Sequence, residues 1–199
     1  MRFLTVCTTI AMALSVACSS STSATRGPGE SAHAPLLSTA VEDGLVVEKA
    51  SLAGTGKIDV WSYFRVTEDK DGGRGKVIVR KTIDLNSDGK PDVSQFYDDR
   101  GTLVKEQIDH DFDGRADTVK VFKNGKIDSE EASSLFDGKF DIRKYYEDGV
   151  LVVKQVDSRR VGAFDEFQYY KGSKLYRIGW DKDGDGKPEV FDENPAMSE

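Results

Sequence analysis

The chain repeats an acidic nine-residue segment at nearly constant intervals, and this repeat limits the folds that it can adopt. Six copies begin, in chain order, at Ser51, Asp84, Asp109, Ser133, Asp157 and Asp181. The last five starts are 25, 24, 24 and 24 residues apart, and the first copy is the faintest. A fixed period of this length is typical of proteins that stack one supersecondary unit many times.

Each interval between the acidic segments contains two strand-like stretches separated by a turn. Residues 117–132, for example, read DTVKVF, then KNG, then KIDSEEA. Asn124-Gly125 and Asp148-Gly149 are strong signals for two-residue type I′ turns, in which both central residues have positive φ. The spacing therefore predicts one β-hairpin per repeat, and the acidic segments are the loops that join successive hairpins.

These hairpins predict an all-β fold, an antiparallel up-and-down meander of about six 24-residue hairpin repeats over residues 44–194. Adjacent apolar pairs such as Val121-Phe122 and Tyr145-Tyr146 place apolar rows on both faces of the sheet, because successive side chains in a strand point to opposite sides. This pattern favours a single twisted sheet rather than a sandwich with one dry face. It leaves two outcomes, an open sheet or one that coils into a barrel- or propeller-like form.

Three of the loops carry oxygen ligands at alternate places. We number the nine loop residues as places one to nine. The loops at 84–92 and 109–117 read D-x-[DN]-x-D-G-x-x-D, and the loop at 181–189 differs by ending in Glu. A hard cation such as Ca²⁺ takes about 6–8 oxygen ligands, so this pattern predicts a calcium site in each loop, with a backbone carbonyl at place seven. The predicted ligands are Asp84, Asn86, Asp88, Lys90, Asp92, Asp109, Asp111, Asp113, Arg115, Asp117, Asp181, Asp183, Asp185, Lys187 and Glu189.

The DxDxDGxxD pattern of these loops resembles the calcium loops of integrin-type FG-GAP repeats and of thrombospondin type 3 repeats. The resemblance covers nine residues per copy and implies bound calcium. The loops at 51–59, 133–141 and 157–165 depart from it, because residues such as Leu135 and Val161 replace ligands. In the last of these loops, Arg159 is a candidate to supply the positive charge of the missing ion.

The N-terminus is typical of an exported protein. Arg2 precedes a short apolar stretch, and small residues follow it, which predicts a signal peptide over residues 1–17. The segment Leu14-Ser15-Val16-Ala17-Cys18 resembles the lipobox of bacterial lipoproteins, which implies acylation of Cys18 with fatty acids such as palmitate, and Ser19 implies sorting to the outer membrane. Residues 18–43, rich in Ser, Thr, Ala and Gly, predict a flexible lipidated tether.

Composition excludes several functions. The net charge of −7 comes with no basic cluster, so nucleic acid is not an expected partner. His110 lies in a predicted calcium loop, and no nucleophile or phosphate motif is present, so the chain is not expected to be an enzyme. We expect a calcium-binding lipoprotein of the bacterial cell envelope that contacts the lipid bilayer through Cys18.

Two roles remain for such a lipoprotein. The first is a scaffold, adhesion or docking component for an envelope protein or polymer. The alternative is a calcium-dependent carbohydrate or cell-wall binding module that uses Tyr145, Tyr146, Tyr169 and Tyr170 as a stacking platform. Even spacing of the aromatic residues, one set per repeat, favours the first role, because cross-strand packing requires that spacing.

Overall fold

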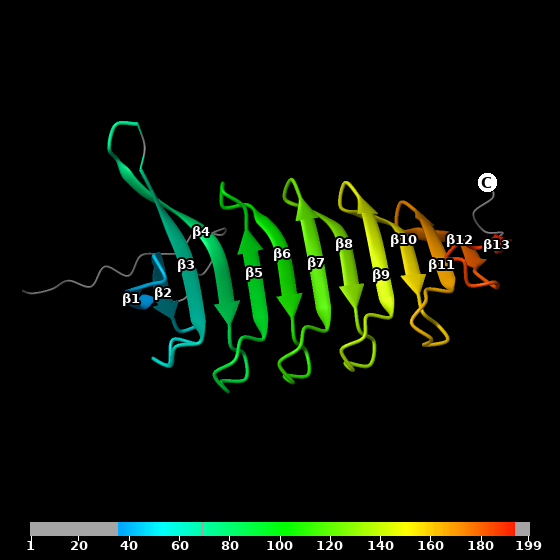
Figure 1. The fold of residues 1–199 in the computed structure, drawn as a ribbon, viewed down its shortest axis with the longest axis horizontal. Helices are drawn as coiled ribbons and strands as arrows, with labels where there is room; N and C mark the ends of the chain where they lie inside the picture. Colours follow the sequence, from blue (N-terminus) through cyan, green and yellow to red (C-terminus); the bar gives the residue numbers. More distant parts are fainter. Residues whose placement is uncertain (1–35, 69, 194–199) are drawn as a thin grey trace, which may run out of the picture. The chain divides into compact units, whose positions relative to one another are not determined.

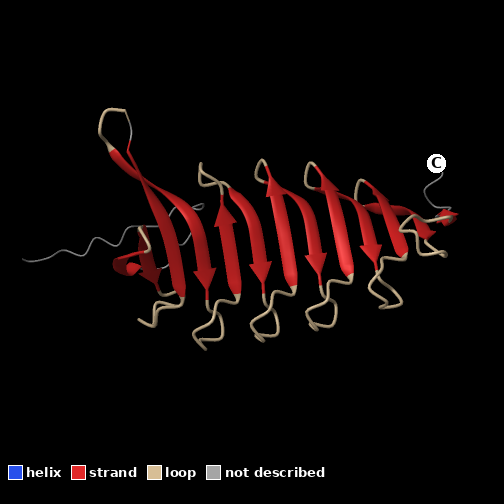
Figure 2. Ribbon diagram, viewed as in Figure 1, coloured by secondary structure: helices blue, strands red, loops and turns tan. Residues whose placement is uncertain are grey.

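The computed structural model describes residues 36–68 and 70–193 of the 199-residue chain. The predicted signal peptide and Cys18 lie outside these residues. Thirteen strands form one antiparallel sheet in which every strand pairs with its neighbours in sequence (Figure 1, Figure 2). The strands are β1 (Leu36–Glu42), β2 (Leu45–Ala50), β3 (Val60–Glu68), β4 (Arg74–Ile83), β5 (Val93–Tyr97), β6 (Leu103–Ile108), β7 (Thr118–Lys123), β8 (Lys126–Ala132), β9 (Ile142–Glu147), β10 (Val150–Val156), β11 (Glu166–Lys171), β12 (Lys174–Trp180) and β13 (Val190–Glu193).

The sheet confirms the predicted all-β meander and decides between its two forms. β1 and β13 pair only with β2 and β12, so the sheet remains open and does not close into a barrel or propeller. Within the described part of the chain, no helix has the length and apolar character needed to cross a membrane.

The folded part begins earlier than the sequence analysis placed it. β1 lies within residues 18–43, which were predicted to be a flexible tether. Asp43 and Gly44, with φ of 50° and 76°, make the same kind of turn that joins β7 to β8 and β9 to β10, and they pair β1 with β2. The tether prediction is therefore wrong for residues 36–43. Asp43-Gly44 is itself a hairpin turn signal, and it joins β1 to β2.

The two predicted hairpin turns have the expected backbone. Asn124 and Gly125 have φ of 52° and 76°, and Asp148 and Gly149 have φ of 52° and 84°. Both central residues of each turn thus lie in the left-handed region, as a type I′ turn requires. This geometry matches the right-handed twist of the flanking strands.

A β-bulge recurs in the hairpins, and it was not predicted from the sequence. In the hairpin of β11 and β12, Tyr169 pairs with Arg177 and Tyr170 pairs with Leu175, which leaves Tyr176 as the extra residue. The equivalent extra residues in the other four hairpins from β3 onward are Val79, Val104, Asp128 and Val152. Because a bulge increases the local twist of a strand pair, one bulge per hairpin twists the sheet at regular intervals.

The sheet has very little apolar core. Among the described residues, the buried hydrophobic side chains are Val47, Val60 and Phe167, whereas most other strand residues remain partly exposed. Cross-strand ion pairs such as Lys120 with Glu106 and Lys144 with Glu130 occupy the middle of one face. The most extensive buried layer is instead polar and lies where the strands meet the acidic loops.

Replacing Gly125 with alanine tests how far the turn geometry holds a hairpin together. A Cβ on Gly125 would meet nothing within 4 Å, so its cost comes from the positive φ alone. We expect G125A to lower the free energy of unfolding by about 1–2 kcal/mol in urea denaturation. In the matched variant Asn124→Gly, the new glycine can also adopt positive φ. We expect its free energy of unfolding to differ from wild type by no more than about 0.5 kcal/mol. Equal losses in both variants would contradict the predicted turn geometry.

Candidate metal centres

The six acidic loops lie along one edge of the sheet, opposite the hairpin turns (Figure 1). All six share one backbone conformation, in which places four and six have positive φ. Loop 84–92, for example, has φ of 68° at Ser87 and 91° at Gly89. The three loops that lack ligands keep this conformation, so the loop shape does not depend on a full set of carboxylates.

Most of the carboxylates at places one and nine are buried and hold the loop backbone, whereas Asp59 is partly exposed and Glu189 is exposed. Asp84 accepts hydrogen bonds from the N–H groups of Ser87 (2.5 Å) and Gly89 (2.9 Å). Asp92, at place nine, accepts one from Leu85 N–H at 2.6 Å. The bond from place two to place nine recurs in all six loops. These two places therefore have a structural role that is separate from any metal.

Successive loops are joined through the backbone of the same residues. The Asp109 N–H donates to the Asp92 carbonyl oxygen at 2.8 Å, and the Asp157 N–H donates to the Asp141 carbonyl oxygen at 2.9 Å. The buried aspartates consequently follow one another across the sheet, and we call them the aspartate row. It comprises Asp84, Asp92, Asp109, Asp117, Asp141, Asp157, Asp165 and Asp181.

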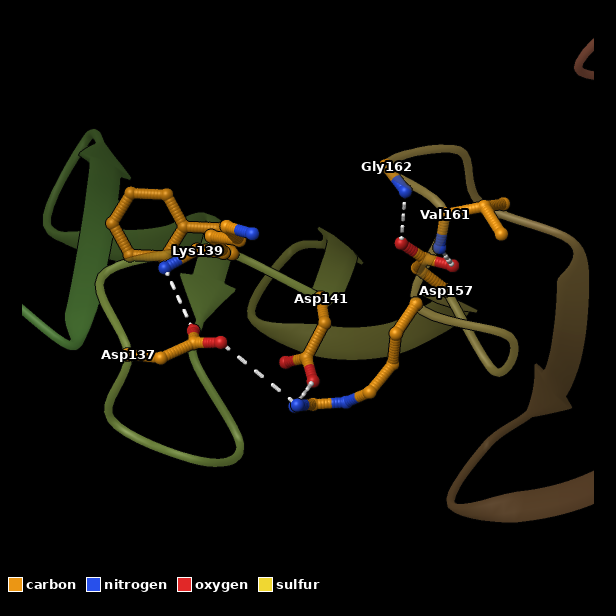
Figure 3. Close-up of a pocket in the computed structure, with 8 residues that line it drawn as sticks. Asp137, Lys139, Asp141, Asp157, Val161 and Gly162 are labelled. Carbon is orange, nitrogen blue, oxygen red and sulfur yellow. Dashed lines mark hydrogen bonds and ion pairs between the residues drawn. The ribbon is translucent and has the colours of Figure 1, made fainter.

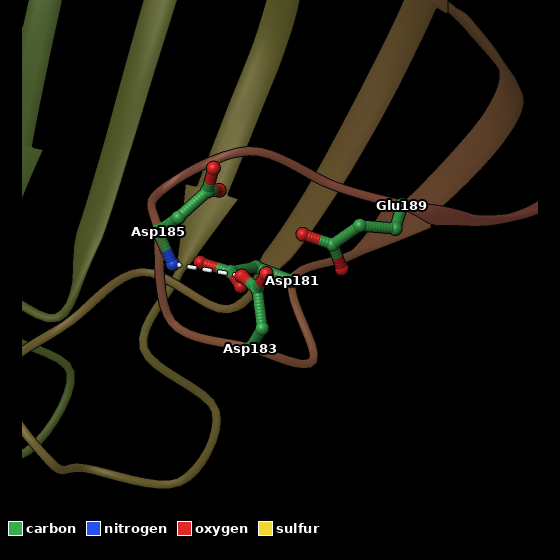
Figure 4. Close-up of side chains that lie close together, drawn as sticks. All are labelled: Asp181, Asp183, Asp185 and Glu189. Carbon is green, nitrogen blue, oxygen red and sulfur yellow. Dashed lines mark hydrogen bonds between the residues drawn. The ribbon is translucent and has the colours of Figure 1, made fainter.

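The last loop gathers the largest carboxylate cluster of the described residues. Asp181, Asp183, Asp185 and Glu189 each place one carboxylate oxygen within 4.8 Å of the others (Figure 4). Asp181 is buried and accepts two backbone hydrogen bonds, whereas the other three side chains are exposed. Lys187, predicted to contribute its carbonyl, donates its N–H to Asp185 at 2.8 Å. This cluster could hold a metal ion.

Loop 109–117 forms a second cluster, from Asp109, Asp111 and Asp117. Partial desolvation raises the pKa of Asp111, and the negative charges of Asp113 and Asp117 raise it further. A cation placed among these groups would relieve that repulsion. The predicted ligand Asp113 does not join the cluster but forms a two-pronged ion pair with Arg115, at 2.8 Å and 2.6 Å. The guanidinium group lowers the pKa of Asp113.

The carboxylates of the remaining predicted site, loop 84–92, do not gather into a cluster. Asp84, Asp88 and Asp92 of loop 84–92 do not form a carboxylate group of the kind seen in the two other loops. Asp88 and Asn86 accept backbone hydrogen bonds from two residues ahead, from Lys90 and Asp88, each at 2.8 Å, and the loop at 181–189 has the same pair of bonds. These Asx turns keep the loop compact while its side-chain oxygens stay exposed.

Two of the incomplete loops contain guanidinium groups in place of a full ligand set. Arg159 Nε donates to Asp165 at 2.7 Å, which confirms that its charge lies where the sequence suggested. Arg160 reaches into the preceding loop and pairs with Asp141 at 2.6 Å, with Asp137 at 3.9 Å (Figure 3). Arg160, Asp141 and Asp137 line a pocket of about 380 Å³ between loops 133–141 and 157–165. Arg160 was not among the residues predicted to have this role, because a contact between two loops leaves no pattern in the sequence of either loop.

Serine hydrogen bonds and arginine charges together lower the pKa of two buried carboxylates, Asp141 and Asp165. Burial raises the pKa of Asp141, but hydrogen bonds from Ser134 and the Arg160 ion pair outweigh it and hold the pKa below its usual value. The pKa of Asp165 is lowered in the same way, by Ser158 and Arg159 against the opposing effect of burial. Both carboxylates are therefore charged at neutral pH without a metal ion.

One face of the sheet carries the aromatic row that the sequence predicted. Tyr63, Arg80, Phe96 and Lys105 pair in succession across four strands. The Arg80 guanidinium lies 3.9 Å from the centre of the Tyr63 ring, and Lys105 Nζ lies 5.8 Å from that of Phe96. Farther along the same face, a shallow groove of about 300 Å³ is lined by Val119, Val121, Ser129, Glu131, Arg143 and Tyr145.

Comparisons with known proteins leave the family of this chain undefined. No protein-family model and no curated protein sequence matches it. A chain in the crystal structure of accessory secretory protein 1,2 and 3 in Streptococcus pneumoniae aligns over 67% of this chain, at 14% identity and a TM-score of 0.28. The alignment covers 23% of that chain, and a likeness of this degree establishes neither fold family nor function.

Removing the Arg160 charge tests whether it replaces a cation. A carboxyl group whose pKa is lowered in the folded state stabilises the fold at pH values above its pKa in the unfolded state, which is near 4. This stabilisation is lost as the pH falls through the lower pKa of the folded state. We expect R160Q to reduce the free energy of unfolding at pH 7 by up to about 1 kcal/mol, since solvent screens the partly exposed guanidinium. The difference from wild type should diminish as the pH falls through the lowered folded-state pKa of Asp141.

The exposed pair of Arg65 and Asp99 provides the control for this experiment. Asp99 is largely exposed, so R65Q should change stability very little at any pH. Urea denaturation followed by circular dichroism between pH 7 and pH 2.5 measures both variants. A loss in R160Q that persists unchanged in acid would show that Arg160 acts through packing and not through the charge of Asp141.

Proposed function

We propose that the chain is a calcium-binding lipoprotein of the bacterial envelope that acts as a scaffold or docking component. The observation that carries this proposal is the pair of carboxylate clusters, in loops 109–117 and 181–189, on an open single-layer sheet. The sheet has both faces and one loop edge available for contact.

Calcium fits the ligand chemistry of the clusters better than other common metals. All predicted ligands are oxygens, and no cysteine lies in the described residues, which disfavours soft metals. Ca²⁺ accepts irregular shells of about 6–8 oxygens, whereas Mg²⁺ requires a near-ideal octahedron. Four carboxylates in a loop with Gly184 and Gly186 at positive φ suit the more permissive ion.

The ion would stabilise the junction between hairpins. Loop 181–189 connects β12 to β13, and loop 109–117 connects β6 to β7. A ligand that binds the folded chain only adds stability in proportion to its concentration relative to its dissociation constant. In the incomplete loops, Arg159 and Arg160 supply positive charge from the chain itself.

Docking is the role that we favour over carbohydrate binding. Arg80 and Lys105 lie over Tyr63 and Phe96, so these two rings already have cation–π partners in place of a free stacking face. Tyr145, beside the shallow groove, is the more exposed candidate for sugar stacking. An even distribution of aromatic pairs over the sheet suits cross-strand packing better than a single focused sugar site.

Calcium binding is tested by removing charge without removing hydrogen bonds. The double variant D183N/D185N keeps the oxygens that accept the backbone N–H groups of Asp185 and Lys187, but it halves the number of carboxylates in the cluster. We expect isothermal titration calorimetry to show loss of one Ca²⁺ per chain, from a wild-type site with a dissociation constant of about 10⁻⁴–10⁻³ M. Millimolar Ca²⁺ should raise the Tm of wild type more than that of the variant.

Asp137 provides the matched control. It occupies place five of loop 133–141 and makes the same type of bond to the Lys139 N–H, but it belongs to no carboxylate cluster. D137N should leave calcium uptake unchanged. If wild type takes up no Ca²⁺, or takes up Mg²⁺ equally well, the proposed metal is wrong.

The anchor is tested at Cys18, which lies outside the described residues. We expect mass spectrometry of the mature protein to find an acylated N-terminal Cys18 and no trace of residues 1–17. Several acyl chains give stable membrane anchoring, so C18S should move the protein from the membrane fraction to the soluble fraction. An unmodified Cys18 in membrane-associated wild type would contradict the anchor.

A further inference from the structure

The first strand of the sheet is an open edge with little charge. Among the described residues, β1 pairs only with β2, and it is seven residues long (Figure 1). Its sequence, LLSTAVE, contains one charged residue, Glu42. Leu36 and Val41 on this strand are 57% and 75% exposed. An exposed strand edge of this kind is a template for pairing with a further strand.

The strand at the other end of the sheet, β13, lacks these properties. It has four residues, and two of them are acidic, Asp192 and Glu193. Antiparallel pairing of β13 with a second β13, centred on Phe191, would place Glu193 opposite Glu189. Pairing centred on Asp192 would place the two copies of Asp192 opposite each other. Like charges directly opposite each other destabilise a strand pair, so self-association through β13 is disfavoured.

Two residues of β1 direct their backbone groups toward the open edge. In a hairpin with a two-residue turn, the residues that flank the turn exchange both backbone hydrogen bonds, and every second pair along the strands does the same. In β1 the residues that bond to β2 in this way include Glu42 and Ala40. The N–H and C=O groups of Thr39 and Val41 consequently point away from β2, and no other described strand lies beside β1 to bond them.

These edge groups are complementary to those of a second copy of the chain. A two-fold axis at Ala40 places Thr39 of each copy opposite Val41 of the other, so that all of their N–H and C=O groups find partners. A bulge between Leu36 and Ser38 interrupts the regular edge beyond this stretch. Registers centred elsewhere on β1 therefore leave more of these groups without partners.

The charges of the first hairpin favour the same register. Lys49 on β2 bonds to Glu42 of its own copy at 2.7 Å. Their backbones are one strand spacing and four residues apart, about 14 Å. In the register centred on Ala40, Glu42 of the second copy lies opposite Ser38, which is the neighbour of Lys49. The backbones of Lys49 and that Glu42 are then two strand spacings apart, about 10 Å, so Lys49 can pair across the junction with less extension than within its own chain.

We infer that two copies of this chain associate through β1 and form one continuous antiparallel sheet. The contact is one strand wide and smaller than the interface of a stable dimer, so we expect weak association, with a dissociation constant of about 10⁻⁴ M. Confinement to a membrane, as proposed above, would raise the effective concentration of the two copies. The association does not require bound calcium, because β1 and β2 lie outside loops 109–117 and 181–189.

Disulfide trapping tests the register. The full chain carrying C7S and C18S has no other cysteine, since the sequence contains two. A single cysteine is then introduced as A40C in one variant and as S38C in the other, two residues apart on the same face of β1. In the inferred register the two copies of residue 40 form a non-hydrogen-bonded pair with Cα atoms about 4.5 Å apart, which a disulfide can bridge. The two copies of residue 38 are about 14 Å apart, beyond the reach of a disulfide.

The variants are compared at a chain concentration of about 10⁻⁴ M in a glutathione buffer that contains a chelator. We expect A40C to form the covalent dimer at least about tenfold faster than S38C, because association raises the local concentration of the two thiols. V190C, on β13, should be as slow as S38C. Any contact made by the N-terminus is common to all three variants.

Sedimentation velocity of the C7S/C18S chain without an added cysteine provides a second measurement, in case A40C disturbs β1. We expect a dimer whose proportion rises with concentration in the presence of the chelator. Equal rates for A40C and S38C, faster trapping of V190C, or a chain that stays monomeric at about 10⁻³ M would overturn the inference. Because the chelator is present throughout, these outcomes do not depend on whether the chain binds calcium.

Discussion

The fold depends on buried carboxylates that accept hydrogen bonds from the backbone. At the loop edge, the oxygens of the aspartate row take up N–H groups that the tight loops leave without strand partners. A buried unpaired N–H is costly, and a charge-assisted hydrogen bond is roughly twice as strong as a neutral one. With three buried apolar side chains among the described residues, this polar layer holds successive hairpins in register where an ordinary sheet would rely on a packed core.

The aspartate row concentrates negative charge at one edge of the sheet. This charge can be neutralised by positive charge in two ways. Loops 109–117 and 181–189 gather carboxylates that could hold a metal ion. Loops 133–141 and 157–165 use Arg159 and Arg160, and Arg160 crosses from one loop to the next. Place nine is a carboxylate in both kinds of loop, whereas place three is a carboxylate only in the loops that could hold a metal ion. The same backbone therefore supports a metal-binding junction or a metal-independent one.

An open sheet of this kind presents three distinct surfaces. One face carries aromatic rings under basic side chains, and the other carries rows of cross-strand ion pairs. The loop edge differs from both, because it combines the buried aspartate row with exposed apolar loop side chains such as Leu135 and Val161.

The sequence by itself determined the repeat, the hairpins and the loop positions, because turn chemistry and strand alternation are local properties. Asn124-Gly125 and Asp148-Gly149 specified their turns without tertiary context, and the spacing of Asp181, Asp183, Asp185 and Glu189 placed them in one loop. The tertiary structure alone decided that the sheet stays open, because closure depends on accumulated twist and on strands far apart in the chain. It also decided that Asp113 turns to Arg115 and that Arg160 crosses to Asp141, since such pairings depend on distances between side chains and not on their order in the chain.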